Sequence, residues 1–135
     1  MNNNTSQSYA MAAARLLLSL VFLLSGLGKL GALDGTRAYM EATGVPGGLL
    51  WPTIAFEVGA GLLVMLGYRT RIVAALLSGF CVASAALFHH NFADQIEMIM
   101  FLKNLSMAGG FLLLAAVGPG LFSLDARFAP TRAVP

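Results

Sequence analysis

Long apolar stretches alternate along the chain with short segments that are rich in glycine, proline and charge. Four of these stretches approach the length of about 20 residues that a helix needs to cross a bilayer core of about 30 Å. They cover approximately residues 9–30, 49–66, 72–88 and 96–117. The pattern therefore predicts an all-α protein with four membrane-spanning helices.

The connections between the predicted spans are short and contain helix-breaking residues. They cover residues 31–48, 67–71 and 89–95, and Gly118-Pro119-Gly120 ends the last span. Because short connections place consecutive helices antiparallel, we predict an up-down-up-down four-helix bundle over residues 10–122. Residues 1–9 are predicted to form a polar N-terminal tail, and residues 123–135 a C-terminal tail.

The composition argues against a soluble globular protein. Of the 135 residues, 58% are hydrophobic and 10% are charged, whereas soluble domains carry about 25% charged residues. The net charge of +2 comes from residues that are scattered along the chain, so no basic patch indicates nucleic-acid binding. We therefore expect a lipid bilayer as a partner and exclude nucleic acid.

The single cysteine limits the redox chemistry that the chain supports. Cys81 lies inside an apolar stretch, and no second cysteine exists for a disulfide, a Cys-x-x-Cys pair, a thiolate zinc site or an iron–sulfur cluster. We interpret Cys81 as a packing residue.

The first apolar stretch has an alternative interpretation as a cleaved signal peptide, because Arg15 precedes its apolar core. No Ala-x-Ala pattern follows the core closely, and Lys29 lies on the same helical stripe as Arg15. These features favour a retained spanning helix.

Basic residues predict the orientation of the spans, since they favour the cytoplasmic side. One side of the bundle collects Arg15, Arg69, Arg71, Arg127 and Arg132, and the other side collects Lys29, Arg37 and Lys103. Both termini are therefore predicted to be cytoplasmic. Arg15 is explained as an anchor that reaches the cytoplasmic surface or meets Asp125.

Charged residues inside the spans mark the candidate site. A charge at the centre of a spanning helix costs at least about 2.5 kcal/mol, so it needs a partner or a function. Glu57 and Lys103 lie inside spans that descend from the outer side, and Lys29 ends the first span at that side. The simplest arrangement flanks an ionised Glu57 with both lysines. We predict that Lys29, Glu57 and Lys103 line a polar pocket in the outer half of the bundle.

The excess positive charge of such a cluster would attract an anionic ligand or the carbonyl oxygen of a quinone. His89 ends the third span on the same side and is a candidate proton carrier, because imidazole exchanges protons near neutral pH. The alternative is that these charges only fix the register of the helices. The sequence supports a ligand site and a purely structural role about equally.

A metal or haem site has weaker support. His89 and His90 are adjacent, so on a helix they diverge by about 100°, and no further histidine supplies an opposing haem ligand. A metal site that uses either histidine with Asp94 or Glu97 stays open as an alternative, although carboxylates near a membrane surface are usually solvated. We predict no metal.

Small residues also repeat along the third span. Ala75, Gly79 and Ala83 form a ridge that allows close helix packing within the bundle or in a homo-oligomer.

The ordered set of these features is similar to a known family. The set comprises Arg15, Gly26 and Lys29, then Glu57-Val58-Gly59 with Gly61 and Gly67, a histidine at the outer end of the third span, Lys103 with Gly109-Gly110, Gly118-Pro119-Gly120, and Ser123-Leu124-Asp125. Over residues 10–128 the chain resembles the DoxX family of small four-helix bacterial membrane proteins. The resemblance implies a location in the bacterial cytoplasmic (inner) membrane.

The functions of that family set the expectations for this chain. Members are linked to thiosulfate:quinone oxidoreductase, to resistance against quinones and electrophiles, and to membrane complexes that handle oxidative stress. Thiol-redox members have cysteines that this chain lacks. The resemblance implies a membrane subunit of a quinone-linked oxidoreductase or oxidative-stress system that binds a quinone-like or small anionic ligand. Because the chain has no cysteine pair and no set of haem ligands, any electrons must come from a partner subunit or pass through bound quinone.

Two other classes of function are compatible with the sequence. The main alternative is a non-catalytic scaffold or assembly subunit of a larger membrane complex, in which the buried charges are purely structural. A transporter or channel is less favoured, since the four short spans lack broken helices and obvious polar pore stripes.

Overall fold

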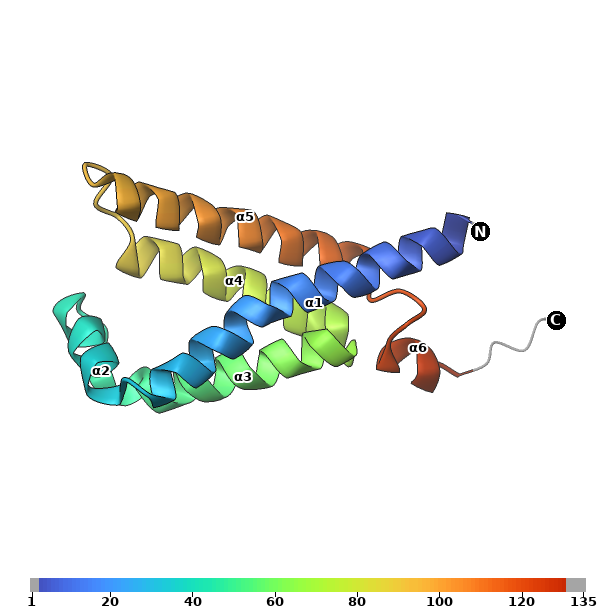
Figure 1. Cartoon of the computed structure of the whole chain (residues 1–135), viewed down its shortest axis with the longest axis horizontal. Coiled ribbons are helices and arrows are strands. Elements are labelled where there is room, and N and C mark those ends of the chain that lie inside the picture. The colour runs from blue at the N-terminus through green and yellow to red at the C-terminus, as the bar shows by residue number, and fades with distance from the viewer. Residues whose placement is uncertain (1–2, 131–135) are drawn as a thin grey trace.

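The computed structural model describes residues 3–130, and over this range it is all helical, as predicted (Figure 1). The helices are α1 (Asn3–Leu30), α2 (Leu33–Ala42), the 3-10 turn η1 (Gly47–Leu49), α3 (Leu50–Leu66), α4 (Thr70–Phe88), α5 (Gln95–Val117) and α6 (Leu124–Phe128). In the described part of the chain, α1, α3 (with η1), α4 and α5 are long and apolar enough to cross a membrane. The four predicted spans are confirmed.

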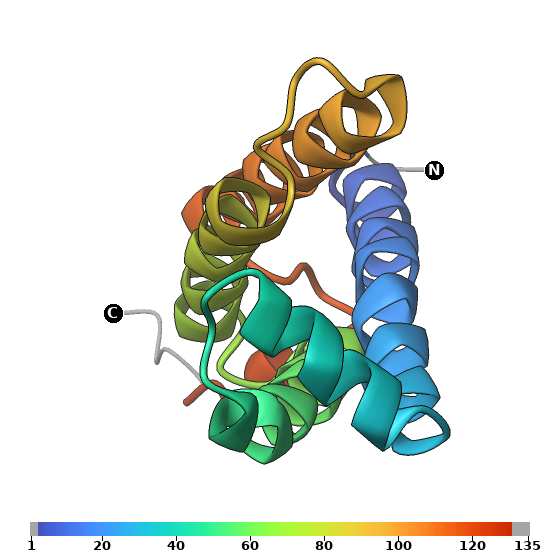
Figure 2. The ribbon, with the colours of Figure 1, turned by 90° about the vertical axis from the view of Figure 1, so that its left-hand side faces the viewer.

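The long helices form two pairs rather than an evenly packed bundle. α1 packs along α3, and α4 packs along α5. The pairs meet near the α3–α4 turn and diverge toward α2, as Figure 1 and the end-on view in Figure 2 both show. The main core lies where the pairs meet. Its most buried side chains include Val64, Leu77 and Phe111, together with Cys81, which is fully buried as the packing interpretation predicted.

Apolar side chains cover the outside of the long helices. Leu17 is 72% exposed, Leu24 is 67% exposed and Leu113 is 63% exposed. In a soluble protein such a surface would promote aggregation, whereas in a bilayer the same side chains contact hydrocarbon. The chain is thus a membrane protein whose long helices contact the lipid bilayer.

The N-terminal segment differs from the expected polar tail. Residues 3–9 are helical and continue α1, and residues 1–2 lie outside the described part. The segment is held by the chain that follows α5. The Ser8 hydroxyl accepts a hydrogen bond from the Leu121 N–H at 3.3 Å, and the Tyr9 ring packs on Phe122 with centroids 4.7 Å apart. These contacts explain why a polar sequence extends the helix.

The expected C-terminal tail likewise contains structure. Residues 124–128 form α6, for which the Ser123 hydroxyl caps the N-terminus by accepting a hydrogen bond from the Ala126 N–H at 3.1 Å. Residues 131–135 lie outside the described range.

The segment 31–48, expected to be an irregular connection, contains α2 and η1. α2 exposes Asp34 and Glu41 and buries Met40 against Leu50 and Ile54 of α3. A helix this short gives too weak a periodic signal to outweigh the glycines and Pro46 around it. In the structure, α2 crosses the open end of the two helix pairs (Figure 2).

Arg15 anchors the opposite end, but not in the way that was expected. Its side chain is buried, and its guanidinium donates a hydrogen bond to the carbonyl of Phe122. Within the described residues it forms no ion pair with Asp125, so neither a surface position nor a direct pair is observed. Gly67 ends α3 in the left-handed conformation (φ +70°), and a Cβ there would collide with the Arg15 guanidinium. The anchor joins α1 to the chain after α5.

Two further charges cap helices at this end. Asp125 accepts hydrogen bonds from the N–H groups of Arg69 (2.7 Å) and Thr70 (2.9 Å) at the start of α4. Arg71 donates to the last carbonyls of α5, including that of Ala115 at 3.0 Å. Burial by itself would raise the pKa of Asp125, but the hydrogen bonds from Thr70 and Arg69 and the charge of Arg15 together lower it below its usual value.

Replacing Asp125 with alanine is expected to lower the free energy of unfolding at pH 7 by about 1 kcal/mol, a typical cost of losing a helix cap. Because the pKa is lowered on folding, the contribution of the ionised carboxylate is present above about pH 4 and is lost as the pH falls further. Thermal unfolding in detergent at pH 7 and pH 3 should show a smaller difference from wild type at pH 3. The control is Asp34→Ala, which removes an exposed carboxylate. An equal loss at both pH values would contradict the expectation.

Candidate functional site

A cavity of about 1040 Å³ lies between the two helix pairs, beneath α2. This volume is at the upper end of small-molecule sites, which span roughly 300–1,000 Å³. All four long helices and α2 contribute to its walls, and most of its lining side chains are apolar. The polar groups include all four residues predicted from the sequence, Lys29, Glu57, His89 and Lys103.

Lys29 and Glu57 form an ion pair at the wall made by α1 and α3. The ammonium Nζ of Lys29 lies 2.8 Å from Oε2 and 3.0 Å from Oε1 of Glu57. The Ser25 hydroxyl joins them, because it accepts from Lys29 Nζ at 2.6 Å and donates to Glu57 Oε1 at 3.2 Å. The Glu57 side chain is 6% exposed and that of Lys29 is 23% exposed. A buried carboxylate is thus matched by a cation from the end of α1.

Glycine makes this close approach feasible. A Cβ at Gly26 would lie 2.7 Å from Cγ2 of Val58 and 3.2 Å from Cβ of Glu57, so a larger residue there would push α1 away from α3. Ser25 and Lys29 are one helical turn apart and therefore share a face. The sequence of α1 positions both polar groups against Glu57.

Lys103 lies on the α5 wall of the same cavity, separate from the ion pair. It is exposed, and over residues 3–130 it forms no ion pair with an acidic side chain. The expectation that two lysines flank Glu57 is therefore wrong as regards direct contact. The reason is the divergence of the helix pairs, which places α5 away from α3 at this depth (Figure 1).

His89 lies where α4 ends, at the end of the cavity that α2 covers. Its Nδ1 is 3.2 Å from Oε2 of Glu97 on α5. In the described part of the chain, no hydrogen bond joins His89 to Lys29 or Glu57. The imidazole is thus paired with Glu97, and its role as a proton carrier stays a prediction.

Tyr39 of α2 covers the cavity beside His89. Its ring stacks on Phe88 with centroids 5.6 Å apart, and its hydroxyl donates to the Phe88 carbonyl at 3.4 Å. Burial, followed by the negative charge of Glu97, raises the pKa of Tyr39. The phenol is therefore a neutral hydrogen-bond donor at physiological pH.

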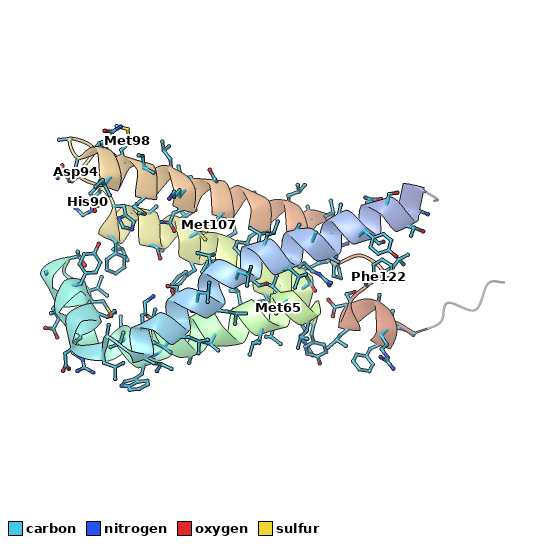
Figure 3. All side chains as sticks on the ribbon, in the orientation of Figure 1. Met65, His90, Asp94, Met98, Met107 and Phe122 are labelled. Atoms are coloured by element: carbon cyan, nitrogen blue, oxygen red, sulfur yellow. The ribbon has the colours of Figure 1, made fainter. Side chains whose placement is uncertain are left out.

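The alternative metal site is not assembled in the described residues, where no group of three histidine, cysteine or acidic side chains comes together. Asp94 instead caps α5 by accepting a hydrogen bond from the Ile96 N–H at 2.8 Å. Figure 3 shows His90 and Asp94 at the α4–α5 connection, whereas Met107 lies farther along α5, near the space between the helix pairs.

Sequence reasoning missed several polar residues of the cavity, among them Ser25 and Tyr39. Ser25 had a usable signal, since it lies one turn before Lys29 on the same face. Tyr39 had none, because it reaches the cavity through α2, whose helical form and position across the open end were not predicted.

Comparison with known proteins adds the evolutionary context. The sequence model of the DoxX family matches residues 10–90, well over half of the chain. The chain belongs to the DoxX family. The family resemblance in the sequence is confirmed, and no solved structure matches the chain.

Two relatives of this DoxX protein are inner membrane proteins of Escherichia coli (strain K12). YqjF is 44% identical over 119 residues, covering 88% of this chain and 92% of YqjF. YphA is 41% identical over 121 residues, covering 84% and 86% of the two chains. A more distant relative, CatD of Bacillus subtilis (strain 168), is 29% identical over 75 residues, or 56% of each chain, and its name provisionally describes an oxidoreductase.

Proposed function

We propose that this DoxX-family protein binds a quinone-like ligand in the cavity, as the membrane subunit of a quinone-linked oxidoreductase or oxidative-stress system. The observation that carries the proposal is the combination of largely apolar walls with a buried ion pair and a second ammonium group in one cavity of about 1040 Å³. Apolar walls suit a ring, and a few convergent polar groups fix its orientation, which is the usual design of a small-molecule site.

The lysines supply the recognition of ring oxygens. Each ammonium donates hydrogen bonds, and donors that carry a charge form the stronger ones. Glu57 and Ser25 hold Lys29 in place, so that this lysine presents a fixed donor at the α1 wall. Lys103, on the opposite wall, offers a second donor that is not committed to a described acidic residue. The same charges would also suit a small anionic ligand.

Protons and electrons would take different routes. His89 and Glu97, which pair beside α2, would pass protons. The sequence has one cysteine and two adjacent histidines, so it offers neither a cysteine pair nor opposed haem ligands. Electrons would therefore come from a partner subunit or from the bound quinone. The name of the relative CatD supports an oxidoreductase context.

The location is proposed from the relatives and from the charges. YqjF and YphA are inner membrane proteins, which supports the bacterial cytoplasmic membrane for this chain. The end that carries Arg15, Arg69 and Arg71 would face the cytoplasm together with both termini. The cavity then lies in the outer half of the bilayer.

Quinone binding to the purified protein tests the proposal. Titration of ubiquinone-1 by calorimetry in detergent should give saturable binding to the wild type. Glu57→Gln and Lys103→Met should each weaken it by about tenfold, the effect of losing one charge-assisted hydrogen bond. Matched controls are Glu41→Gln, an exposed carboxylate at the same end, and Arg127→Met, an exposed cation on α6, since neither residue lines the cavity.

Full retention of ubiquinone-1 binding in both site variants would overturn the ligand proposal. The scaffold alternative predicts a different result, in which Lys103→Met lowers thermal stability or the recovery of a partner in a mild-detergent pull-down without any change in ligand binding. Recovery of the protein always alone, or as a homo-oligomer only, would count against a scaffold.

A further inference from the structure

The two sides of the cavity are closed to different extents. On the α3–α4 side, Phe88 of α4 packs against the buried cluster that Leu50 and Ile54 of α3 form with α2. Nearer the main core, the rings of Phe56 on α3 and Phe80 on α4 lie 5.1 Å apart. Contacts at two levels therefore join these helices along the cavity.

On the α1–α5 side, the contacts are confined to the floor of the cavity. Phe22 of α1 meets Phe111 of α5 with ring centroids 5.4 Å apart, and a Cβ at Gly110 would lie 3.3 Å from Cδ2 of Leu18. Above this level, no hydrogen bond, aromatic pair or core cluster joins residues 23–30 of α1 to residues 95–106 of α5. Figures 1 and 2 agree that these ends of the two helices lie apart.

The residues that border this side can be identified from the helix faces. Gly26 of α1 faces α3, and at about 100° per residue Val21 lies on the flank away from it. On α5, the carbonyl of Ala108 accepts a hydrogen bond from Ser78 of α4, and Ser106 lies on the opposite flank. Val21 and Ser106 both line the cavity, and both are exposed. The cavity thus reaches the outer surface of the protein between α1 and α5.

This surface faces hydrocarbon, because apolar side chains cover α1 and α5 beside it. Leu17, below Val21 on α1, is 72% exposed, and Leu102, beside Ser106 on α5, is 53% exposed. The Lys29–Glu57 ion pair lies on the α1–α3 wall of the cavity, while the α1–α5 side combines the apolar Val21, Leu102 and Met107 with the polar Lys103, Asn104 and Ser106. A polar ring at the ion pair and a long apolar chain that leaves beside Val21 and the exposed Leu102 suit this arrangement.

We propose that the α1–α5 side is a lateral opening to the bilayer and that the ligand is a membrane-dissolved quinone with a long hydrocarbon tail. Its ring lies at the Lys29–Glu57 wall, and its tail passes between Val21 and Ser106 into the lipid. This inference rests on the proposed quinone-binding function and specifies its ligand class. A tail that leaves through the opening stays in hydrocarbon, so neither entry nor binding exposes it to water.

The test compares two quinones that share a ring and differ in the tail. The probes are 2,3-dimethoxy-5-methyl-1,4-benzoquinone, which has no tail, and decylubiquinone, which carries ten carbons. For the wild type in detergent, decylubiquinone should bind at least about tenfold more tightly, because part of its tail packs against the opening. Val21→Trp and Ser106→Trp, which fill the opening from either helix, should each reduce this ratio to less than about threefold.

Matched controls place the same indole on the lipid-facing surface. Leu17→Trp and Leu105→Trp lie on the same two helices outside the cavity lining and should keep the wild-type ratio. In detergent, the decylubiquinone tail also partitions into the micelles. This partition is the same for the control variants and the opening variants, so it cancels when their binding ratios are compared. Ser106→Leu provides a smaller obstruction in case a tryptophan variant fails to fold.

The outcomes separate the two proposals. An equal ratio in the opening variants and in the controls, or the absence of a tail preference in the wild type, would overturn the lateral opening and leave quinone binding in place. Absence of saturable binding of either quinone to the wild type would overturn the proposed function, and the lateral opening with it.

Discussion

Replacing Lys29 with methionine is expected to lower the free energy of unfolding by about 3 kcal/mol, a typical cost of leaving one partner of a buried ion pair alone. The cost should exceed that of Glu57→Gln, because the two partners differ in their access to water. The Glu57 side chain is 6% exposed inside α3, whereas the Lys29 side chain is 23% exposed at the end of α1. An unpaired Lys29 can therefore move toward the surface, and an unpaired Glu57 cannot. Unfolding in mixed micelles with increasing dodecyl sulfate measures the difference.

A double variant separates the ion pair from the shape of its side chains. Lys29→Met combined with Glu57→Leu removes both charges and should recover most of the stability, since apolar residues of similar size often replace a buried pair without loss. Lys103→Met is the matched control, because within the described residues Lys103 pairs with no acidic side chain that its loss would leave unpaired. A double variant as unstable as Lys29→Met alone would show that packing, and not charge, sets the cost.

Much of the fold could be predicted because membrane length is a strict constraint. Four apolar stretches of suitable length specify four spans, and short connections specify that neighbours run antiparallel. Neither feature specifies how far apart the helices lie. The division into an α1–α3 pair and an α4–α5 pair depends on side-chain contacts, such as Gly26 with Val58, that periodicity does not reveal.

The same distinction explains the site. The pairing of Lys29 with Glu57 was accessible from the sequence, because depth in the membrane and helical face place both groups at one level. Lys103 lies at a similar depth, but depth gives no lateral distance, and the structure places it on the opposite wall. Tyr39 depends on α2, a short helix with polar residues on its outer face, and its contact with Phe88 exists only once α2 crosses the open end.

Gly26→Leu is expected to destabilise the protein by about 3 kcal/mol, at the upper end of the usual cost of overpacking. The first atom of the new side chain would already lie 2.7 Å from Cγ2 of Val58, a β-branched residue with little freedom to move. α1 and α3 must then separate. Gly28→Leu is the control, because no atom lies within 4 Å of a Cβ at that position. It should leave stability unchanged or raise it slightly, since glycine is a poor helix former. Equal effects at both positions would contradict a close α1–α3 contact.

The effect of Gly26→Leu should also depend on Glu57. Lys29 is one turn beyond Gly26 on the same helix, so moving α1 away from α3 lengthens the distance between Lys29 Nζ and the Glu57 carboxylate. Part of the destabilisation is then the loss of the ion pair itself. On a Glu57→Gln background, Gly26→Leu should cost less than it does in the wild type, and the difference measures the coupling between helix packing and the site. Strict additivity would mean that the ion pair forms independently of the helix contact that brings it together.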